Sequence, residues 1–205
     1  DADAEDAKAE GAALSQQLRT DLEQVLLQNR RVLRLVNQLL DIARLESHTL
    51  TLHVQPVALR SFLQRIACAF KPLASQRTLT FNQHLADAEG SGPDGSNGTV
   101  PADPEHLETV VVNLLSNAFK FTPPGGTITL RAEWQAQGVR LQVTDTGPGI
   151  PEEEHDTIFE RFAQSNTAAA STAAASRGMS ANGTGIGLAL VKALTEAHGG
   201  RVSVE

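Results

Sequence analysis

Three polar side chains recur at steps of four and three within an otherwise apolar stretch of the 205-residue chain. Asn113, Asn117 and Lys120 would share one side of a helix, beside an apolar stripe that can pack on a sheet. Amide oxygens are acceptable ligands for Mg²⁺, and a lysine ammonium meets phosphate as a point charge. The spacing predicts a metal–phosphate site, and a solvated helix face is the alternative.

A carboxylate follows a segment in which apolar and polar residues alternate. The sequence Asp-Thr-Gly-Pro-Gly-Ile occupies residues 145–150 and places Asp145 at the end of an expected strand. Gly147 and Gly149 let the backbone approach a ligand closely. The Asp145 carboxylate can accept a hydrogen bond from an exocyclic amine such as that of adenine. The simpler alternative is a tight turn closed by an Asx hydrogen bond.

A glycine-rich run, Gly-Thr-Gly-Ile-Gly-Leu at residues 183–188, opens the last expected helix. Backbone N–H groups and the positive end of a helix dipole bind phosphate well at such a place. Leu at position 188 excludes the Rossmann fingerprint, and the lysine of a P-loop is not in register. A flexible helix start would also explain the glycines.

These residues need a scaffold, and the chain begins with a long amphipathic helix. Residues 15–46 place apolar side chains at alternating steps of four and three, with Asn29 in the seam. This pattern is typical of a coiled coil or a four-helix bundle. Such a helix cannot bury its own apolar stripe, so it needs another helix beside it.

The rest of the chain predicts an α+β domain. Strands are expected at residues 50–54 (ended by Pro56), 79–81, 127–134, 139–145 and from Val202 onward. Helices are expected at residues 58–76, 104–121, 152–162 and 185–197. Residues 86–102 predict a flexible loop, and residues 163–182 predict a mobile segment poor in apolar side chains.

Composition limits the classes of function. The net charge is −7 and the pI about 5.4, which disfavours non-specific binding to nucleic acid or anionic lipid. Cys68 is the only cysteine, so no internal disulfide can form. No stretch approaches the roughly 20 apolar residues that span a bilayer. No signal peptide opens the chain, because residues 1–10 are acidic and rich in alanine.

Taken together, the motifs resemble those of the catalytic ATP-binding domain of sensor histidine kinases, within the superfamily that includes gyrase-type ATPases. Residues 113–122 resemble the N box, residues 145–150 the G1 box, Phe-Glu-Arg-Phe at 159–162 the F box, and residues 183–188 the G2 box. His198-Gly199-Gly200 resembles the usual end of the last helix. Residues 29–46 are similar to the second helix of the kinase dimerisation hairpin.

The resemblance implies a two-layer α/β sandwich, in which helices cover one face of a mixed sheet, preceded by the dimerisation-type helix. Residues 1–14 would be a disordered or frayed start, and residues 15–48 the helix, without the acceptor helix that precedes it in the family. Residues 49–205 would form the catalytic domain, truncated at its C-terminal strands. Residues 163–182 would be the ATP lid.

The resemblance also assigns roles to residues. Asp145 would read adenine, Asn117 would hold Mg²⁺ with Asn113 nearby, Lys120 would reach phosphate, and Phe121 would line the pocket. The implied ATP-binding residues are Asn113, Asn117, Lys120, Phe121, Asp145, Gly147, Gly149, Ile150, Phe162, Gly183, Thr184, Gly185, Ile186, Gly187 and Leu188.

The implied cofactors and partners are ATP, Mg²⁺, a histidine-bearing dimerisation helix, a response-regulator receiver domain and a second copy bound through residues 15–48, with no nucleic acid. The phospho-accepting histidine is expected outside this chain, because the surroundings of its six histidines differ from those of the family's acceptor: His48, His53, His84, His106, His155 and His198. No catalytic residue is therefore assigned, and the fragment is not expected to autophosphorylate alone.

A cytoplasmic domain is implied, whether or not a longer parent is anchored in the bacterial inner membrane. Two alternatives remain open. One is a nucleotide-binding module that lacks kinase activity, as in a degenerate kinase. The other is a different ATPase or a serine-kinase relative with the same fold, and such relatives usually lack a helix like that of residues 15–46.

Overall fold

A computed structural model describes residues 50–85, 98–136, 138–163 and 185–205, together with part of residues 16–47. The chain divides into two compact units, Asp1–Ser47 and His48–Glu205. The expected boundaries of the domains, including the segments at 1–14 and 163–182, stay predictions. None of the described helices is long and apolar enough to cross a membrane.

In the first unit, the described residues from Gln16 to Ala43 are helical. Gln17 donates from Nε2 to Oδ1 of Asp21 over 3.0 Å, one turn further along the helix. The described apolar side chains of the expected stripe are exposed: Leu18, Leu22, Val25, Leu26, Val32, Leu33, Val36 and Leu40. The described part of this unit is therefore helical and exposes its apolar side chains.

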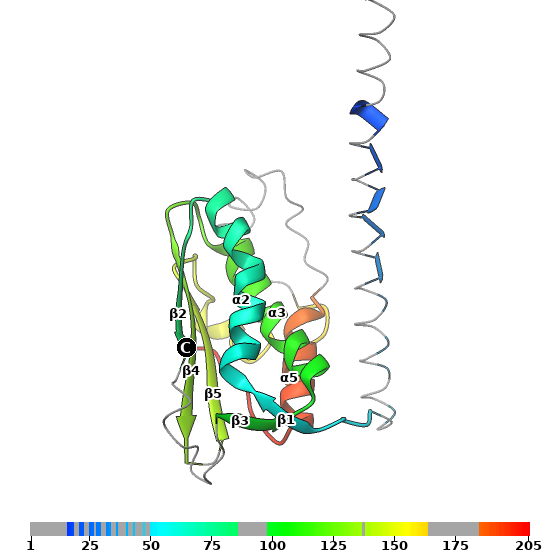
Figure 1. The fold of residues 1–205 in the computed structure, drawn as a ribbon, viewed down its shortest axis with the longest axis vertical. Helices are drawn as coiled ribbons and strands as arrows, with labels where there is room; N and C mark the ends of the chain where they lie inside the picture. Colours follow the sequence, from blue (N-terminus) through cyan, green and yellow to red (C-terminus); the bar gives the residue numbers. More distant parts are fainter. Residues whose placement is uncertain are drawn as a thin grey trace, which may run out of the picture. The chain divides into compact units, whose positions relative to one another are not determined.

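The second unit contains a mixed three-stranded sheet in the order β2-β4-β5 (Figure 1). Strand β2 (Thr80–Leu85) is parallel to β4 (Thr127–Gln135), and β4 is antiparallel to β5 (Gly138–Asp145). The last two form the expected hairpin. Alternate residues of β4 are buried, which gives the sheet one apolar face and one polar face.

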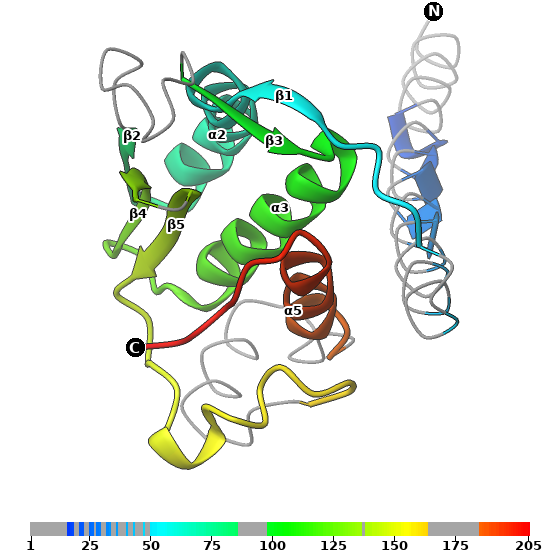
Figure 2. The ribbon, with the colours of Figure 1, turned by 90° about the horizontal axis from the view of Figure 1, so that it is seen from below.

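Two helices, α2 (Leu59–Gln76) and α3 (Pro104–Phe121), cover the apolar face, and α5 (Gly187–Ala197) packs against α3 (Figures 1 and 2). The core between the layers is fully apolar at its centre. Its most buried side chains, at most 1% exposed, are Leu63, Ala67, Val111, Leu115, Phe119, Ile128 and Leu130. The expected fold class, a two-layer sandwich with helices on one face of a mixed sheet, is confirmed.

A separate two-stranded ribbon joins β1 (Gln55–Ala58) and β3 (Thr99–Ala102) in antiparallel register. Pro56 and Pro101 are direct partners in this register. Two expectations were wrong here. The first strand lies at Gln55–Ala58 and includes Pro56, whereas residues 50–54 belong to no helix or strand. The expected loop at 86–102 ends in strand β3, which pairs with β1 rather than with a neighbour in sequence.

Two further expectations near the C-terminus were wrong. The helix expected at 152–162 is a single 3₁₀ turn, Glu152–Glu154, followed by turns. This polar segment offers few apolar side chains to pack, and short helices depend on such packing. Residues 201–205 form no strand, although Arg140 of β5 bonds to Glu205 over 2.7 Å. No ladder hydrogen bonds join them to the described strands.

Candidate functional site

Helix α3 is positioned by its first turn. Asp103 is the N-cap, and its Oδ1 accepts hydrogen bonds from the main-chain N–H groups of Glu105 (3.0 Å) and His106 (3.2 Å). Pro104 occupies the first helical position, where its missing N–H costs nothing. The helix then runs to Phe121 and carries the polar stripe predicted from the sequence. The three side chains of this stripe are partly buried: Asn113, Asn117 and Lys120.

Asn113 faces the start of helix α5. Its Nδ2 donates to the carbonyl oxygen of Thr109 over 2.8 Å, which fixes the orientation of the amide. A Cβ atom added to Gly187 would lie 3.0 Å from Oδ1 of Asn113. The N box and the G2 box therefore touch at a point where any side chain larger than hydrogen would disturb the asparagine.

Asp145 lies at the end of β5, next to the C-terminal end of α3. Its Oδ1 accepts a 2.7 Å hydrogen bond from the Gly147 N–H, so the Asx turn that was the simpler alternative is present. The Oγ1 of Thr122 lies 3.5 Å from the same Oδ1 of Asp145. This hydroxyl also donates to the Ala118 carbonyl over 2.6 Å. Within the described residues Oδ2 of Asp145 has no hydrogen-bond partner, so this exposed oxygen can accept a hydrogen bond from a ligand.

The G1 box also approaches α3 through its backbone. A Cβ atom on Gly147 would lie 2.6 Å from Oδ1 of Asp145 and 3.4 Å from the carbonyl oxygen of Phe121. Glycine is thus required for close packing at this position. At the neighbouring residue of α3, the Lys120 ammonium lies 4.7 Å from the centre of the Phe121 ring, a cation–π distance.

The F box and the start of α5 meet through main-chain atoms. Phe162 and Gly185 both have positive φ, 61° and 64°, which is uncommon for a residue such as phenylalanine. A Cβ on Gly185 would lie 2.5 Å from the Phe162 Cα. The Phe162 ring itself is 66% exposed. The contact therefore joins two backbones and leaves the aromatic side chain at the surface.

The remaining predicted residues are placed as follows. The Ile150 carbonyl is 3.0 Å from Nε2 of His155, which must donate because a carbonyl only accepts. Gly149 has open space around its Cα, Ile186 is buried, and Leu188 is partly buried. Gly183, Thr184 and the segment expected to be the lid, except for Ala163, lie outside the described residues. Between the described residues, no hydrogen bond or ion pair joins Asn117 to the glycine motifs.

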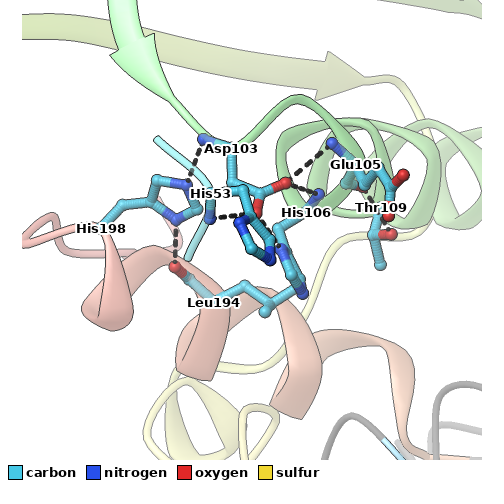
Figure 3. Close-up of polar contacts among 7 residues, drawn as sticks. All are labelled: His53, Asp103, Glu105, His106, Thr109, Leu194 and His198. Carbon is cyan, nitrogen blue, oxygen red and sulfur yellow. Dashed lines mark hydrogen bonds and ion pairs between the residues drawn. The ribbon is translucent and has the colours of Figure 1, made fainter. Parts of the chain in front are cut away.

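The carboxylate of Asp103, which the sequence analysis did not single out, connects several elements at the N-terminal end of α3 (Figure 3). Oδ2 of Asp103 accepts from the His53 N–H over 2.8 Å, and Nδ1 of His106 lies 3.0 Å from the same oxygen, without the angle of a hydrogen bond. The Asp103 N–H donates to Nε2 of His198 over 3.1 Å. Asp103 is only 2% exposed, so these contacts replace its hydration.

Burial by itself raises the pKa of Asp103. The His53 amide, the nearby His106 ring and the His106 amide stabilise the charged carboxylate, outweigh burial and lower the pKa from 3.8 to about 2. An aspartate immediately before Pro104 is a strong N-cap signal, so the sequence could have indicated its capping role. Its link to His198 could not have been found in this way, because the two residues are 95 positions apart.

Two other supporting residues were missed. Thr122, 2% exposed, follows α3 and stands beside Asp145. Arg77, at the C-cap of α2, donates from Nη1 to the Phe119 carbonyl over 2.6 Å and so caps the end of α3. Neither the buried hydroxyl nor the long-range arginine leaves a periodic pattern in the sequence.

The donor chemistry of the polar stripe fits a hard cation. Among the described residues there is no group of three or more His, Cys, Asp or Glu side chains that could hold a metal. Mg²⁺ commonly keeps several waters and takes few protein oxygens together with substrate phosphates. The Asn113 amide, oriented by Thr109, supplies one such oxygen, so the residues present fit a nucleotide-bound magnesium.

Comparison with known sequences finds relatives that are named histidine kinases. The chain is 36% identical over 192 residues to hybrid signal transduction histidine kinase D of Dictyostelium discoideum, covering 91% of this chain and 11% of that protein. It is 36% identical over 175 residues to the circadian input-output histidine kinase CikA of Synechococcus elongatus, covering 85% and 21%. The chain thus spans less than a quarter of the length of each of these two relatives.

Comparison with solved structures also finds histidine kinases. Full-length ShkA, crystallised in complex with AMPPNP, matches with a TM-score of 0.65 and 31% identity over 85% of this chain and 33% of that one. The catalytic domain of histidine kinase ThkA matches with a TM-score of 0.60 and 23% identity over 75% of this chain and 89% of that one, which shows the fold.

One family model covers residues 102–205, just over half of the chain, and includes the segments that resemble the N, G1, F and G2 boxes. The chain belongs to the family of histidine kinase-, DNA gyrase B- and HSP90-like ATPases.

Proposed function

We propose that this chain is the ATP-binding catalytic part of a two-component sensor histidine kinase. In this proposal residues 49–205 bind Mg-ATP and donate its γ-phosphoryl group to a histidine on a separate helix. The observation that carries the proposal is the meeting of three motifs around α3: Asn113 against Gly187, and Asp145 with Gly147 against the end of the helix. The relatives named above are histidine kinases, which supports it further.

The nucleotide would lie along α3. Oδ2 of Asp145 would accept a hydrogen bond from the adenine amine, and Phe121 would line the base pocket. The phosphates would lie toward Lys120 and the main-chain N–H groups at the start of α5, where the helix dipole favours negative charge. Asn117 and Asn113 would hold Mg²⁺, which when bound neutralises charge on the triphosphate.

The chemical step would be an in-line transfer. An imidazole nitrogen of the acceptor attacks the γ-phosphorus, the bond to the β–γ bridging oxygen breaks, and ADP departs while the imidazole loses its proton. Positioning and electrostatic stabilisation supply most of the catalysis. The phosphoryl group would then pass to an aspartate of a response-regulator receiver domain.

The acceptor histidine is proposed to come from outside this chain. Both ring nitrogens of His198 contact main-chain groups, and Nε2 of His155 is bonded to the Ile150 carbonyl. Residues 15–48 would pair with a second copy and with the acceptor helix, because their described apolar stripe is exposed and needs a partner. We place the domain in the cytoplasm, where ATP and receiver domains are found.

The test combines the chain with a histidine-bearing dimerisation domain, Mg²⁺ and γ-labelled ATP. Acid-labile label should appear on the acceptor. Asp145→Asn should lower the initial rate at least tenfold, since an amide NH₂ opposes the adenine amine. Asp156→Asn, at an exposed aspartate outside the motifs, is the matched control and should behave like wild type.

The other outcomes separate the alternatives. Mg-ATP binding without transfer to any supplied acceptor would favour a nucleotide-binding module. Hydrolysis of ATP without transfer would favour another ATPase relative. Equal rates for Asp145→Asn and wild type would reject the proposed pocket.

A further inference from the structure

The N-cap of α3 is completed by a residue from another helix. In a capping box, the side chain at the third helical position reaches back to the main-chain N–H of the N-cap residue. In α3 that position is His106, whose Nδ1 lies against the Asp103 carboxylate instead. The Asp103 N–H donates to Nε2 of His198, directly after α5 (Figure 3).

The two hydrogen-bond partners of the His198 ring define its tautomer. Nδ1 lies 2.8 Å from the Leu194 carbonyl, which can only accept, so Nδ1 carries the proton. Nε2 faces an N–H donor and must therefore be unprotonated. The neutral ring thus caps the end of α5 through one nitrogen and holds the start of α3 through the other.

A second contact lies further along the same helix pair, where Gly187 meets Asn113. From Asp103 to Asn113 the chain advances ten residues, a helical rise of about 15 Å. From Gly187 to His198 it advances eleven residues, about 16.5 Å. Because the two spans match and run in opposite directions, the two contacts together fix how far α5 can slide along α3.

We infer that His198 is a positioning residue for the nucleotide site: its bond to the Asp103 N–H sets the axial register that places the start of α5 against Asn113. This inference rests on the proposed function, since α3 and α5 are the helices that would carry the nucleotide-binding residues. His198 itself does not touch the ligand. The hydrogen bond from Asp103 to His198 lies about 15 Å away, at the start of α3 and the end of α5.

Two substitutions separate the roles of the two ring nitrogens. The side chain of Asn places its amide near the position of Nδ1, so His198→Asn can keep the cap on Leu194 but cannot reach Asp103. The side chain of Gln reaches the position of Nε2, so His198→Gln can keep an acceptor for the Asp103 N–H while losing the Leu194 cap. His84→Asn and His84→Gln, at an exposed histidine of β2, are the matched controls.

The full 205-residue chain is used for calorimetric titration with Mg-ATP, well below the unfolding temperature of each variant. His198→Asn should bind about threefold to tenfold more weakly, as expected for the loss of one hydrogen bond. His198→Gln should stay within about twofold of wild type. Hydrogen exchange should show a faster-exchanging Asp103 amide in His198→Asn only. Both His84 variants should match wild type.

Two results would overturn the inference: weaker binding for His198→Gln than for His198→Asn, or wild-type affinity for a folded His198→Asn. A wild-type chain that binds no ATP would instead reject the proposed function. The exchange of the Asp103 amide still tests the structural part of the inference, because equal exchange in the Asn and Gln variants would refute the hydrogen bond from Asp103 to His198.

Discussion

The main-chain N–H of Phe162 donates a hydrogen bond to the carbonyl oxygen of Gly185, with an N···O distance of 2.9 Å. The F box and the start of α5 are therefore joined by backbone, at a site where both residues have positive φ. This contact requires that Gly185 has no side chain. Adding a methyl group at Gly185 therefore tests it.

Gly185→Ala should destabilise the second unit by about 2 kcal/mol or more, because its Cβ would lie 2.5 Å from the Phe162 Cα and no rotamer can relieve a clash with backbone. Urea unfolding measures the free energy, and calorimetry should show weaker Mg-ATP binding. Gly125→Ala is the control. Its φ is also positive, at 82°, but its Cβ would meet nothing within 4 Å, so it should cost about 1 kcal/mol.

Gly187→Ala should separate stability from binding. Gly187 is the first residue of α5 and its φ is not positive, so alanine should leave the free energy of unfolding unchanged or raise it slightly. The added Cβ would lie 3.0 Å from Oδ1 of Asn113 and should displace that amide, lowering the affinity for Mg-ATP about tenfold.

A double-mutant cycle checks the cause of that loss. In an Asn113→Ala background the amide is already gone, so adding Gly187→Ala should change the affinity little. Additive losses in the double mutant would show that Gly187 acts on the ligand by another route.

Asp103 should make the stability of the domain depend on pH in acid. Its pKa is lowered from 3.8 to about 2 in the folded state, so the unfolded state binds the proton more tightly. The resulting contribution, about 2 kcal/mol, is fully present above about pH 4 and is lost as the pH falls toward 2. Urea unfolding at a series of pH values from 5 to 2 measures it.

Asp103→Asn should flatten that acid dependence, because asparagine keeps a good N-cap but has no charge to titrate. The exposed Asp156, changed to Asn, serves as the control and should leave the slope as in wild type. A slope unaffected by Asp103→Asn would mean that other carboxylates cause the acid sensitivity.

Phe119 should be among the most costly side chains to truncate. It is 1% exposed, and its ring centre lies 5.1 Å from that of Phe70 and 5.3 Å from that of Phe81. Phe119→Ala should lower the free energy of unfolding by about 3–5 kcal/mol, and Phe119→Leu by roughly 1.5 kcal/mol. Equal costs for the two variants would show that the aromatic cluster, rather than filled volume, is the main contribution.

Local signals predicted the parts of the fold that local chemistry determines. Helix α3 begins at Pro104 and ends before the Pro-Pro-Gly-Gly run, as expected, because these residues impose a start and a stop. The β4–β5 hairpin also follows its alternating pattern. Strand β3 was missed because Gly98 and Pro101 are typical of a loop, and only the partner strand β1, more than 40 residues earlier, makes the segment extended.

In the candidate site, too, some residues could be predicted from local sequence and others could not. Its polar stripe and glycine motifs lie in short, contiguous segments, so the spacing of the residues was enough to select them. The residues that hold these motifs in place were not predicted from a pattern. Arg77 contacts a carbonyl 42 positions away, and His198 contacts an amide 95 positions away. Their partners are main-chain groups, which every residue possesses, and so no sequence feature marks the pairing.

The facing prolines of the β1–β3 ribbon have a consequence for behaviour in concentrated solution. Pro56 and Pro101 can be opposite each other only as a pair without mutual hydrogen bonds, in which any N–H would point outward. Each outer border of the ribbon therefore lacks a donor near its middle. A foreign extended chain finds an incomplete row of donors on either border, which should protect this small ribbon against the strand addition that starts aggregation.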